Sequence, residues 1–176
     1  MIRKLSTKEI LQRNLARSVP DSMKELIVFL HDIRSLHNVG AVFRNADAFG
    51  IHKIILSGVT PAPPRPEITK TAIGAEKFVE WQSTDQPKKK LQEINESHTI
   101  IGVEQTENSQ LLPDFSLPNR PVCLVFGNEV TGIDEALLPQ IDSFIEIPQY
   151  GHKHSLNISV AAGVVLYGFL EKYWQY

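Results

Sequence analysis

The feature that most constrains this sequence is a polar, glycine-containing loop that leads directly into an unusually apolar segment near the C-terminus. The loop, residues 148–157, follows a strand predicted over 144–147 and carries Ser155 and Asn157 as short hydrogen-bonding side chains. The segment 160–170 is apolar with small residues interspersed, so the helix predicted there must pack on nearly all of its sides. Polar groups at the start of such a helix are held rigidly and can contact a ligand, or they can simply cap the helix.

Two earlier segments repeat this plan of an apolar strand that ends in polar residues. The first has a strand over 26–30 and then an amphipathic helix that bears Asn38 and Arg44. Their separation of six residues, nearly two helical turns, is interpreted as placing both side chains on the same side. The second has a strand over 122–126 that leads into a glycine and a carboxylate, which suit the close approach of a ligand. Because the carboxyl ends of parallel strands meet at one edge of a sheet, the sequence predicts a crevice shared by Asn38, Arg44, Glu129, Ser155 and Asn157.

Stretches typical of strands and of helices alternate through the rest of the chain. We expect further strands near 53–56, 78–81 and 99–103, and further helices near 67–75 and 86–95. The proline-rich run 60–66 is expected to be a loop, because proline fits neither a helix interior nor a central strand. This alternation predicts an α/β fold with a mainly parallel sheet and helices on both faces.

A capping-box pattern, Ser6-x-x-Glu9, predicts a short N-terminal helix that ends before Pro20. Residues 1–20 are therefore interpreted as a helical extension and residues 21–176 as a single domain. A hydrophobic share of 42% in 176 residues is enough for one substantial core. The single cysteine, Cys123, excludes an internal disulfide framework and is expected to be a small buried side chain in a reducing compartment. The sequence shows no signal peptide or membrane-spanning run, which favours a cytoplasmic location.

Several common enzyme signatures are absent. There is no G-x-G-x-x-G after the first strand and no G-x-x-x-x-G-K-[ST], so dinucleotide and P-loop sites lack their phosphate-binding loops. No two of the six histidines form an H-x-x-x-H pair on a predicted helix, and His152 and His154 lie in a loop, so the sequence predicts no metal site. Asp32, at the end of the first strand, is expected to fix a turn through its own backbone rather than to act as an acid or base.

Three short motifs occur in a fixed order along the chain. They read N-x-G-x-x-x-R-x-A from Asn38, F-G-x-E-x-x-G from Phe126, and I-P-x-x-G-x-x-x-S-L-N-x-S-V-A from Ile147. In this order they closely resemble the motifs of the TrmH (SpoU) family within the SPOUT superfamily of RNA methyltransferases, and the resemblance spans residues 26–169. It implies a SPOUT fold with a deep trefoil knot in the C-terminal third, S-adenosylmethionine as cofactor, a homodimer, and methyl transfer to a ribose 2′-hydroxyl of tRNA or rRNA.

The resemblance also implies roles for individual residues. The adenosine of the cofactor is expected to lie among the main-chain groups of six residues: Val103, Glu104, Gln105, Gly127, Ile147 and Leu156. A side chain at Gly127 would crowd the adenosine. Arg44 is expected to act near the partner subunit's cofactor, where it would grip a phosphate or the 2′-oxygen and stabilise developing negative charge, because a guanidinium stays protonated. Asn38 and Glu129 are expected to position Arg44 or the ribose. Ser155 and Asn157 are expected to shape the pocket and contact substrate or cofactor.

Alternative interpretations remain open at this point. A net charge of −2 is unusual for an RNA-binding protein, and the basic residues at 3–17 and 65–77 are more often explained by solvated helix faces than by phosphate contacts. Arg44 could instead form an ion pair with Asp47, one helical turn further on. The alternative function is a catalytically inactive RNA-binding protein of the same fold, which the presence of all five catalytic candidates disfavours.

Overall fold

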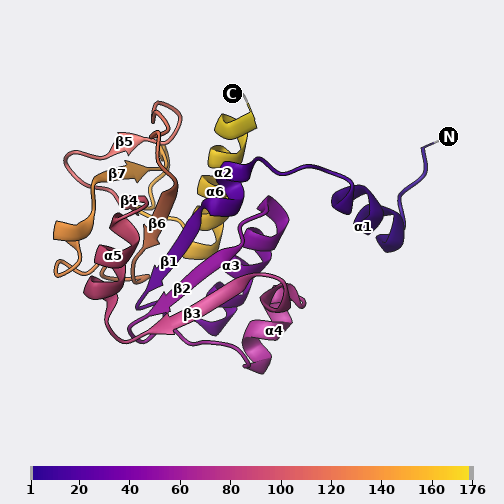
Figure 1. The fold of residues 1–176 in the computed structure, drawn as a ribbon, viewed down its shortest axis with the longest axis horizontal. Coiled ribbons are helices and arrows are strands. Elements are labelled where there is room, and N and C mark those ends of the chain that lie inside the picture. The colour runs from indigo at the N-terminus through magenta and orange to yellow at the C-terminus, as the bar shows by residue number, and fades with distance from the viewer. Residues whose placement is uncertain (1, 175–176) are drawn as a thin grey trace.

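Seven strands form one sheet in the order β3-β2-β1-β6-β4-β7-β5, and each pair of neighbouring strands is parallel (Figure 1). They are seen in a computed structural model, which describes residues 2–174. The strands are β1 (Ile27–His31), β2 (Lys53–Ser57), β3 (Glu80–Thr84), β4 (Thr99–Val103), β5 (Gln110–Leu111), β6 (Val122–Phe126) and β7 (Ser143–Glu146). The helices are α1 (Thr7–Leu15), α2 (Asp21–Glu25), α3 (Leu36–Phe49), α4 (Pro66–Ala72), α5 (Pro87–Asn95) and α6 (Ile158–Trp174), with 3₁₀ turns η1 (Ala75–Lys77) and η2 (Leu138–Gln140).

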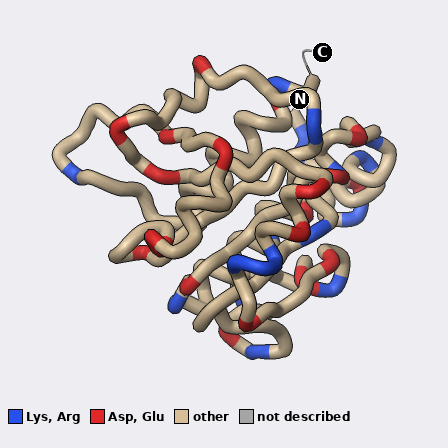
Figure 2. Tube along the Cα trace, turned by 60° about the vertical axis from the view of Figure 1, so that its left-hand side comes forward, with Lys and Arg blue, Asp and Glu red and all other residues tan. Residues whose placement is uncertain are grey.

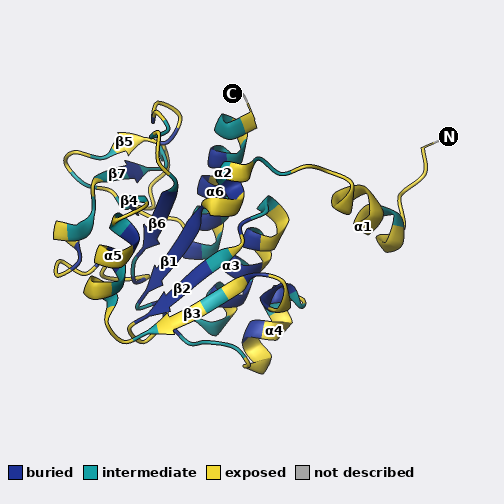
Figure 3. Cartoon of the chain, in the orientation of Figure 1, coloured by how far each residue is buried: buried dark blue, intermediate teal, exposed yellow. Residues whose placement is uncertain are grey.

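The sheet separates two hydrophobic cores. Along β1, Val28 and Leu30 belong to the larger core, which also contains buried residues of α3, α4 and α6, while Ile27 and Phe29 belong to the smaller core beneath α5. This alternation follows from the pleat, which points successive side chains to opposite faces. Because β1 and β6 are covered on both faces, all their residues are buried (Figure 3). The prediction of an α/β fold with a parallel sheet and helices on both faces is confirmed.

Helix α1 lies apart from the body of the molecule (Figure 1). It begins at the predicted capping box, in which the Ser6 side chain accepts from the Glu9 backbone N–H and the Glu9 carboxylate accepts from the Ser6 N–H. None of its residues is buried, so local capping rather than packing defines it.

The expected elements and the observed ones differ mainly on the β2–β3 side of the sheet. Helix α4 ends at Ala72 instead of continuing to Ala75, because Ile73 (φ 52°) and Gly74 (φ 89°) both adopt the left-handed conformation. Strand β3 begins two residues later than expected and lies at the sheet edge, where its exposed residues give no apolar pattern. The short elements α2 and β5 were not predicted, since five and two residues are too few to show a period.

The glycine of the first motif allows α3 and α4 to pack closely. A Cβ atom on Gly40 would collide with the side chain of Thr71 and the carbonyl oxygen of Ile68 in α4. At the same contact, Oγ1 of Thr71 donates a hydrogen bond to the carbonyl of His37 at 3.0 Å. This close packing fixes α3 on the sheet and thereby fixes the position of Asn38 at its first turn.

Along the chain, most Lys and Arg positions lie in the lower and right-hand parts of the view, whereas Asp and Glu positions are spread over the whole trace, including the left-hand loops (Figure 2). Across residues 2–174, no helix combines the length and apolar character needed to cross a membrane. Cys123 is fully buried in β6, and burial raises the pKa of its thiol, in agreement with the expected core role.

Candidate active site

A cleft of about 870 Å³ opens at the carboxyl edge of β4, β6 and β7. The loops that follow these strands line it, together with the first turn of α6. All six residues expected to surround the cofactor lie along its wall: Val103, Glu104, Gln105, Gly127, Ile147 and Leu156. Three of the five catalytic candidates also line it, namely Glu129, Ser155 and Asn157. The strand ends therefore form one cleft, as the parallel sheet predicts.

Glu129 is held at the N-terminal end of α3. Its carboxylate accepts hydrogen bonds from the backbone N–H groups of Arg34 (3.2 Å) and Ser35 (3.3 Å) and from Nδ2 of Asn38 (3.1 Å). Partial burial opposes ionisation, but the hydrogen bonds outweigh it and hold the pKa of Glu129 below its ordinary value. The positive end of the helix dipole favours the same anionic form. The carboxylate is therefore ionised at neutral pH and joins the second motif to the first.

Asn38 links Glu129 to the start of α6. Its Oδ1 accepts a hydrogen bond from Nδ2 of Asn157 at 3.2 Å. Asn157 also caps α6, because its own Oδ1 accepts from the backbone N–H of Ser159 at 2.9 Å. Asn157 thus does more than cap a core helix, since it connects all three motifs through Asn38. Ser155 lines the cleft and is exposed, and within residues 2–174 its side chain makes no hydrogen bond.

The loop after β6 is a tight turn that forms one wall of the cleft. Asn128 and Gly132 exchange two backbone hydrogen bonds of 2.9 and 3.0 Å, and Oδ1 of Asn128 accepts from the N–H groups of Val130 and Thr131. A Cβ atom on Gly127 would collide with the backbone of Gly132 and its neighbour. A side chain at Gly127 was expected to crowd the adenosine. In the structure it would collide first with the loop of its own chain, because the backbone at Gly132 occupies that space.

The charge of the cleft is negative. Four carboxylates line it, and none of the described lining residues is a lysine or arginine; the four are Glu104, Glu129, Glu135 and Glu146. A cationic ligand is favoured in such a field, and a phosphate is disfavoured.

Arg44 does not lie with the other catalytic candidates of its own chain. It is exposed on α3, does not line the cleft, and forms no hydrogen bond or ion pair within the described residues 2–174, including none with Asp47. The expectation that Arg44 and Asn38 point to the same side is wrong for this helix. Six residues at 3.6 per turn leave the two side chains roughly 120° apart around the axis. The structure thus brings Asn38, Glu129 and Asn157 together without Arg44.

Several residues that line the cleft were not predicted from the sequence, among them Thr106, Glu135 and Glu146. Glu146 is the last residue of β7, and its Oε2 accepts a hydrogen bond from Oγ of Ser109 at 2.7 Å. Its position at a strand end was an available signal. Glu135 lies just after the second motif, but its spacing from the motif residues does not indicate a role in the site. Only the folded structure shows that it lines the cleft.

The hydrogen bonds of Glu129 predict a pH-dependent contribution to stability. We expect Glu129→Gln to lower the free energy of unfolding at pH 7 by about 1 kcal/mol, less than a buried charged hydrogen bond because the carboxylate is partly solvated. Since folding lowers the pKa of Glu129, its ionised form stabilises the protein above the unfolded-state pKa, and this stabilisation is lost as the pH falls through the lower folded-state value. Urea unfolding of both proteins between pH 7 and pH 3 measures it. A difference that does not shrink toward acid pH would contradict the assignment.

Comparison with known proteins places the chain in a family. The family model described as the SpoU rRNA Methylase family matches residues 25–167. The tRNA (guanosine(18)-2′-O)-methyltransferase of Aquifex aeolicus is 31% identical over 88% of this chain and 73% of that protein. The 23S rRNA (guanosine-2′-O-)-methyltransferase RlmB of Neisseria meningitidis is 33% identical over 80% of this chain and 56% of its own length.

Solved structures agree with these relatives. The A. aeolicus TrmH/SpoU tRNA modifying enzyme matches with a TM-score of 0.78 at 27% identity, over 96% of this chain and 84% of that one. An AdoMet-bound rRNA methyltransferase from Sinorhizobium meliloti matches with a TM-score of 0.76 at 26% identity, over 86% of this chain but only 57% of that one. The chain thus spans most of the Aquifex proteins and a little over half of the Neisseria and Sinorhizobium proteins. With its three motifs joined at one cleft and the family model matching most of its length, this chain belongs to the SpoU methylase family.

Proposed function

We propose that this chain is an S-adenosylmethionine-dependent RNA methyltransferase that transfers a methyl group to a ribose 2′-hydroxyl of tRNA or rRNA. The observation that carries the proposal is the cleft at which Glu129, Asn38 and Asn157 join the three motifs. The relatives from Aquifex and Neisseria are named as 2′-O-methyltransferases of tRNA and rRNA. The related Sinorhizobium structure is described as AdoMet-bound.

The cleft residues suit this cofactor. Main-chain N–H and C=O groups along 103–106, 127–133 and 154–156 can read the edge of an adenine without special side chains. The carboxylates of the cleft favour a ligand that carries positive charge, and S-adenosylmethionine carries it on a sulfonium and an ammonium group. When bound, the cofactor supplies the methyl group on its sulfonium.

The negative cleft needs a cation for the RNA step. An RNA phosphate and the developing charge on a 2′-oxygen are both disfavoured beside four carboxylates. Arg44 is an exposed guanidinium with no partner within residues 2–174. We propose that Arg44 of one subunit reaches the cleft of a second copy, grips the phosphate or 2′-oxygen there, and so orients the hydroxyl for transfer. The hydroxyl proton then leaves through phosphate or water, because a guanidinium does not act as a base.

Helix α6 supports the homodimer that this mechanism requires. Its apolar residues Val160, Val164 and Tyr167 are 50%, 40% and 52% exposed in the single chain, although the sequence predicts a helix packed on nearly all sides. Across the described residues of one chain, no element covers this face. The ring of Tyr167 lies 5.9 Å from that of Phe49, so the apolar face extends from α6 onto α3, the helix that carries Arg44. A second copy that covers this face would bring Arg44 close to a subunit interface.

A charged substitution on α6 tests the dimer. We expect Val164→Glu to shift the protein from dimer to monomer in light scattering and to abolish methyl transfer, because an unpaired carboxylate cannot be buried in an apolar interface. Ile73→Glu is the matched control, since Ile73 is an equally apolar, exposed residue at the end of α4. Circular dichroism confirms that each variant is folded. A folded, monomeric and fully active Val164→Glu protein would contradict shared active sites.

Cofactor binding is testable without RNA. We expect S-adenosylmethionine at about 100 times its Kd to raise the melting temperature by roughly 5–10 °C, because a ligand bound only by the folded state stabilises it by about 2.7 kcal/mol. Differential scanning fluorimetry measures the shift, and adenosine 5′-phosphate serves as a ligand control that lacks the sulfonium. An unchanged melting temperature at saturating cofactor would overturn the proposal.

Three further expectations belong to the same proposal. Residues 1–20 are assigned as a helical extension and residues 21–176 as a single domain, since α1 contributes nothing to either core; residues 1, 175 and 176 lie outside the described part of the chain. The C-terminal third forms the deep trefoil knot implied by the motifs, and this is consistent with the loops after β6 and β7 that line one cleft. The protein acts in the cytoplasm, where tRNA and rRNA are found.

The alternative is a catalytically inactive RNA-binding protein of the same fold. It shares the basic surfaces but does not require a cofactor. Calorimetry with S-adenosylmethionine separates the two: an absence of binding would favour the alternative, whereas the cleft residues retained here favour the enzyme.

A further inference from the structure

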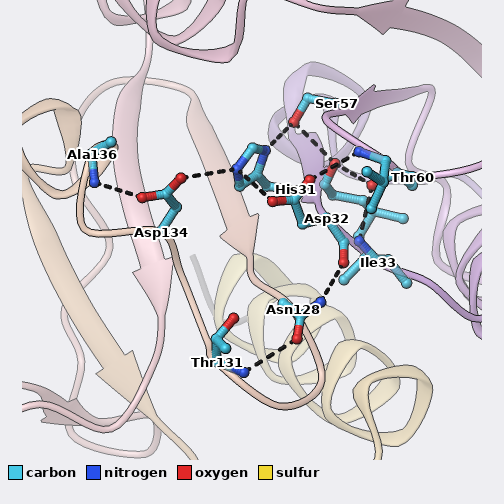
Figure 4. Close-up of polar contacts among 11 residues, drawn as sticks. His31, Asp32, Ile33, Ser57, Thr60, Asn128, Thr131, Asp134 and Ala136 are labelled. Carbon is cyan, nitrogen blue, oxygen red and sulfur yellow. Dashed lines mark hydrogen bonds and ion pairs between the residues drawn. The ribbon is translucent and has the colours of Figure 1, made fainter.

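Three titratable side chains meet at the carboxyl end of β1, outside the residues assigned to methyl transfer (Figure 4). His31 is the last residue of β1, Asp32 follows it, and Asp134 lies in the loop after β6. Nε2 of His31 lies 3.4 Å from Oδ2 of Asp32 and 3.9 Å from Oδ2 of Asp134. His31 is only 4% exposed, and its Nε2 has no hydrogen-bond partner. A buried ring nitrogen without a partner requires an explanation.

The hydrogen bonds around His31 are compatible with a neutral ring that is protonated at Nδ1. Oγ of Ser57 donates its single hydrogen to the carbonyl oxygen of Leu30 at 3.2 Å, because a carbonyl can only accept. In the tautomer that is protonated at Nδ1, the same hydroxyl oxygen accepts from Nδ1 of His31, which lies 2.9 Å away. In that tautomer Nε2 carries a lone pair, which points toward two carboxylate oxygens that are also acceptors. Such a set needs a positive charge at its centre.

Backbone N–H groups orient the carboxylates of Asp32 and Asp134. Oδ1 of Asp32 accepts from the backbone N–H of Val59 at 2.9 Å, so Asp32 fixes a turn of the β2 loop and not, as expected, one of its own backbone. Oδ1 of Asp134 accepts from the N–H of Ala136 at 2.8 Å. Each carboxylate thus has one oxygen fixed by a backbone donor and the other directed at His31. Backbone and hydroxyl partners of this kind orient the ligands of metal sites.

We propose that His31, Asp32 and Asp134 bind a divalent transition-metal ion of the Zn²⁺ type. Imidazole together with carboxylates suits Zn²⁺ better than Mg²⁺, which prefers oxygen ligands alone. With metal–ligand bonds of about 2.1 Å, ligand atoms of a tetrahedral site lie about 3.4 Å apart. The three ligand atoms here already lie within 4.8 Å of one another, so a small movement of the carboxylates completes the site. Asp32 and Asp134 are 36% and 50% exposed, which leaves the fourth position open to water.

A metal at this position would tie the second motif to the centre of the sheet. Asp134 follows the cleft loop directly, and Nδ2 of Asn128 in that loop donates to the carbonyl of Asp32 at 2.7 Å. The ion would therefore connect the end of β1 to the far end of the loop that carries Glu129, while the Asn128 hydrogen bond holds the near end. Its role is structural, because the three ligands are not among the residues that line the cofactor cleft.

Calorimetry on chelator-treated protein tests the site. We expect one Zn²⁺ to bind per chain at pH 7.5, with no comparable binding of Mg²⁺, and Asp134→Asn to weaken the Zn²⁺ affinity at least tenfold. Asn keeps the oxygen that accepts from Ala136, so the variant removes the charge and leaves the loop geometry intact. Asp114→Asn is the matched control, because Asp114 is an exposed carboxylate in a different loop.

Nitrogen-15 NMR of the imidazole provides a second measurement that does not depend on the variant. We expect the resonance of His31 Nε2 to move when Zn²⁺ is added, while Nδ1 stays protonated. Zn²⁺ binding of equal affinity in wild type and Asp134→Asn, with an unmoved His31 resonance, would place the metal elsewhere, as on His152 and His154. A His31 ring that is an imidazolium at pH 7.5 and does not respond to Zn²⁺ would show that a proton fills the site. Either result would overturn the proposal.

Discussion

Arg44→Ala is expected to lower the rate of methyl transfer about 10²- to 10³-fold while leaving the Kd for S-adenosylmethionine unchanged. A loss of this size is typical when one donor to a developing oxyanion is removed. The cofactor is expected to bind in a cleft that Arg44 of the same chain does not line, so its affinity has no reason to change. Arg44 is exposed and forms no hydrogen bond or ion pair within residues 2–174, so the melting temperature should also stay the same. Radiolabelled methyl transfer and calorimetry measure the two effects separately.

Two variants sharpen this test. Arg44→Lys should restore little activity, because an ammonium keeps the charge but lacks the planar fork that contacts phosphate and oxygen together. Arg120→Ala removes the same charge far along the chain, from a side chain that donates to the carbonyl of Asn95, the last residue of α5, and should keep full activity. Near-normal turnover by Arg44→Ala on a methylatable RNA would contradict the assigned role.

Mixed dimers can show whether Arg44 acts across the subunits. Leu156→Trp should block the cleft of its own chain, since Leu156 lines it and is partly exposed. If Arg44 serves the partner's cleft, a dimer of one Arg44→Ala chain and one Leu156→Trp chain contains one complete site, and activity returns on mixing the two inactive proteins. If Arg44 serves its own chain, no complete site forms and the mixture stays inactive.

Local sequence patterns predicted the central sheet and its helices well. The predicted strand at 99–103 coincides with β4, and that at 122–126 coincides with β6. Buried strands in parallel sheets are continuous apolar runs with turn residues at both ends, and these two runs are bounded clearly. The bounds predicted for edge strand β3 were two residues too early. Both faces of this strand are largely exposed, so its sequence shows neither a continuous apolar run nor an alternation of apolar and polar residues.

Much of the candidate site was predictable because its residues follow strands. The ends of β4, β6 and β7 must meet at one sheet edge, and this alone brings Val103, Gly127 and Ile147 to one cleft. The side-chain network was not predictable, since the bond from Asn157 to Asn38 depends on where α6 lies on α3. The His31–Asp134 pair was missed for a similar reason. The two residues lie about one hundred positions apart, and no metal-ligand spacing connects them.

The second large effect is expected from Gly127→Ala. A Cβ atom there meets the backbone of Gly132 and Ile133, which cannot move aside as a flexible side chain would. We expect a loss of about 3 kcal/mol or more in the free energy of unfolding, equivalent to a fall in melting temperature of roughly 6–12 °C. The loop that crosses Gly127 also lines the cofactor cleft, so the thermal shift caused by S-adenosylmethionine should disappear.

Gly151→Ala is the matched control for Gly127→Ala, because a Cβ atom on Gly151 meets nothing within 4 Å. We expect it to change the melting temperature by less than about 2 °C, as is usual for a surface substitution. The pair also separates two explanations for the glycine. If Gly127→Ala melts at the normal temperature yet loses cofactor binding, the methyl group collides with the cofactor, as the motifs alone suggest. If the melting temperature of Gly127→Ala falls before any cofactor is added, the glycine is required because the backbone of Gly132 packs directly against it. Cofactor binding is then lost because the loop that forms the cleft wall is displaced.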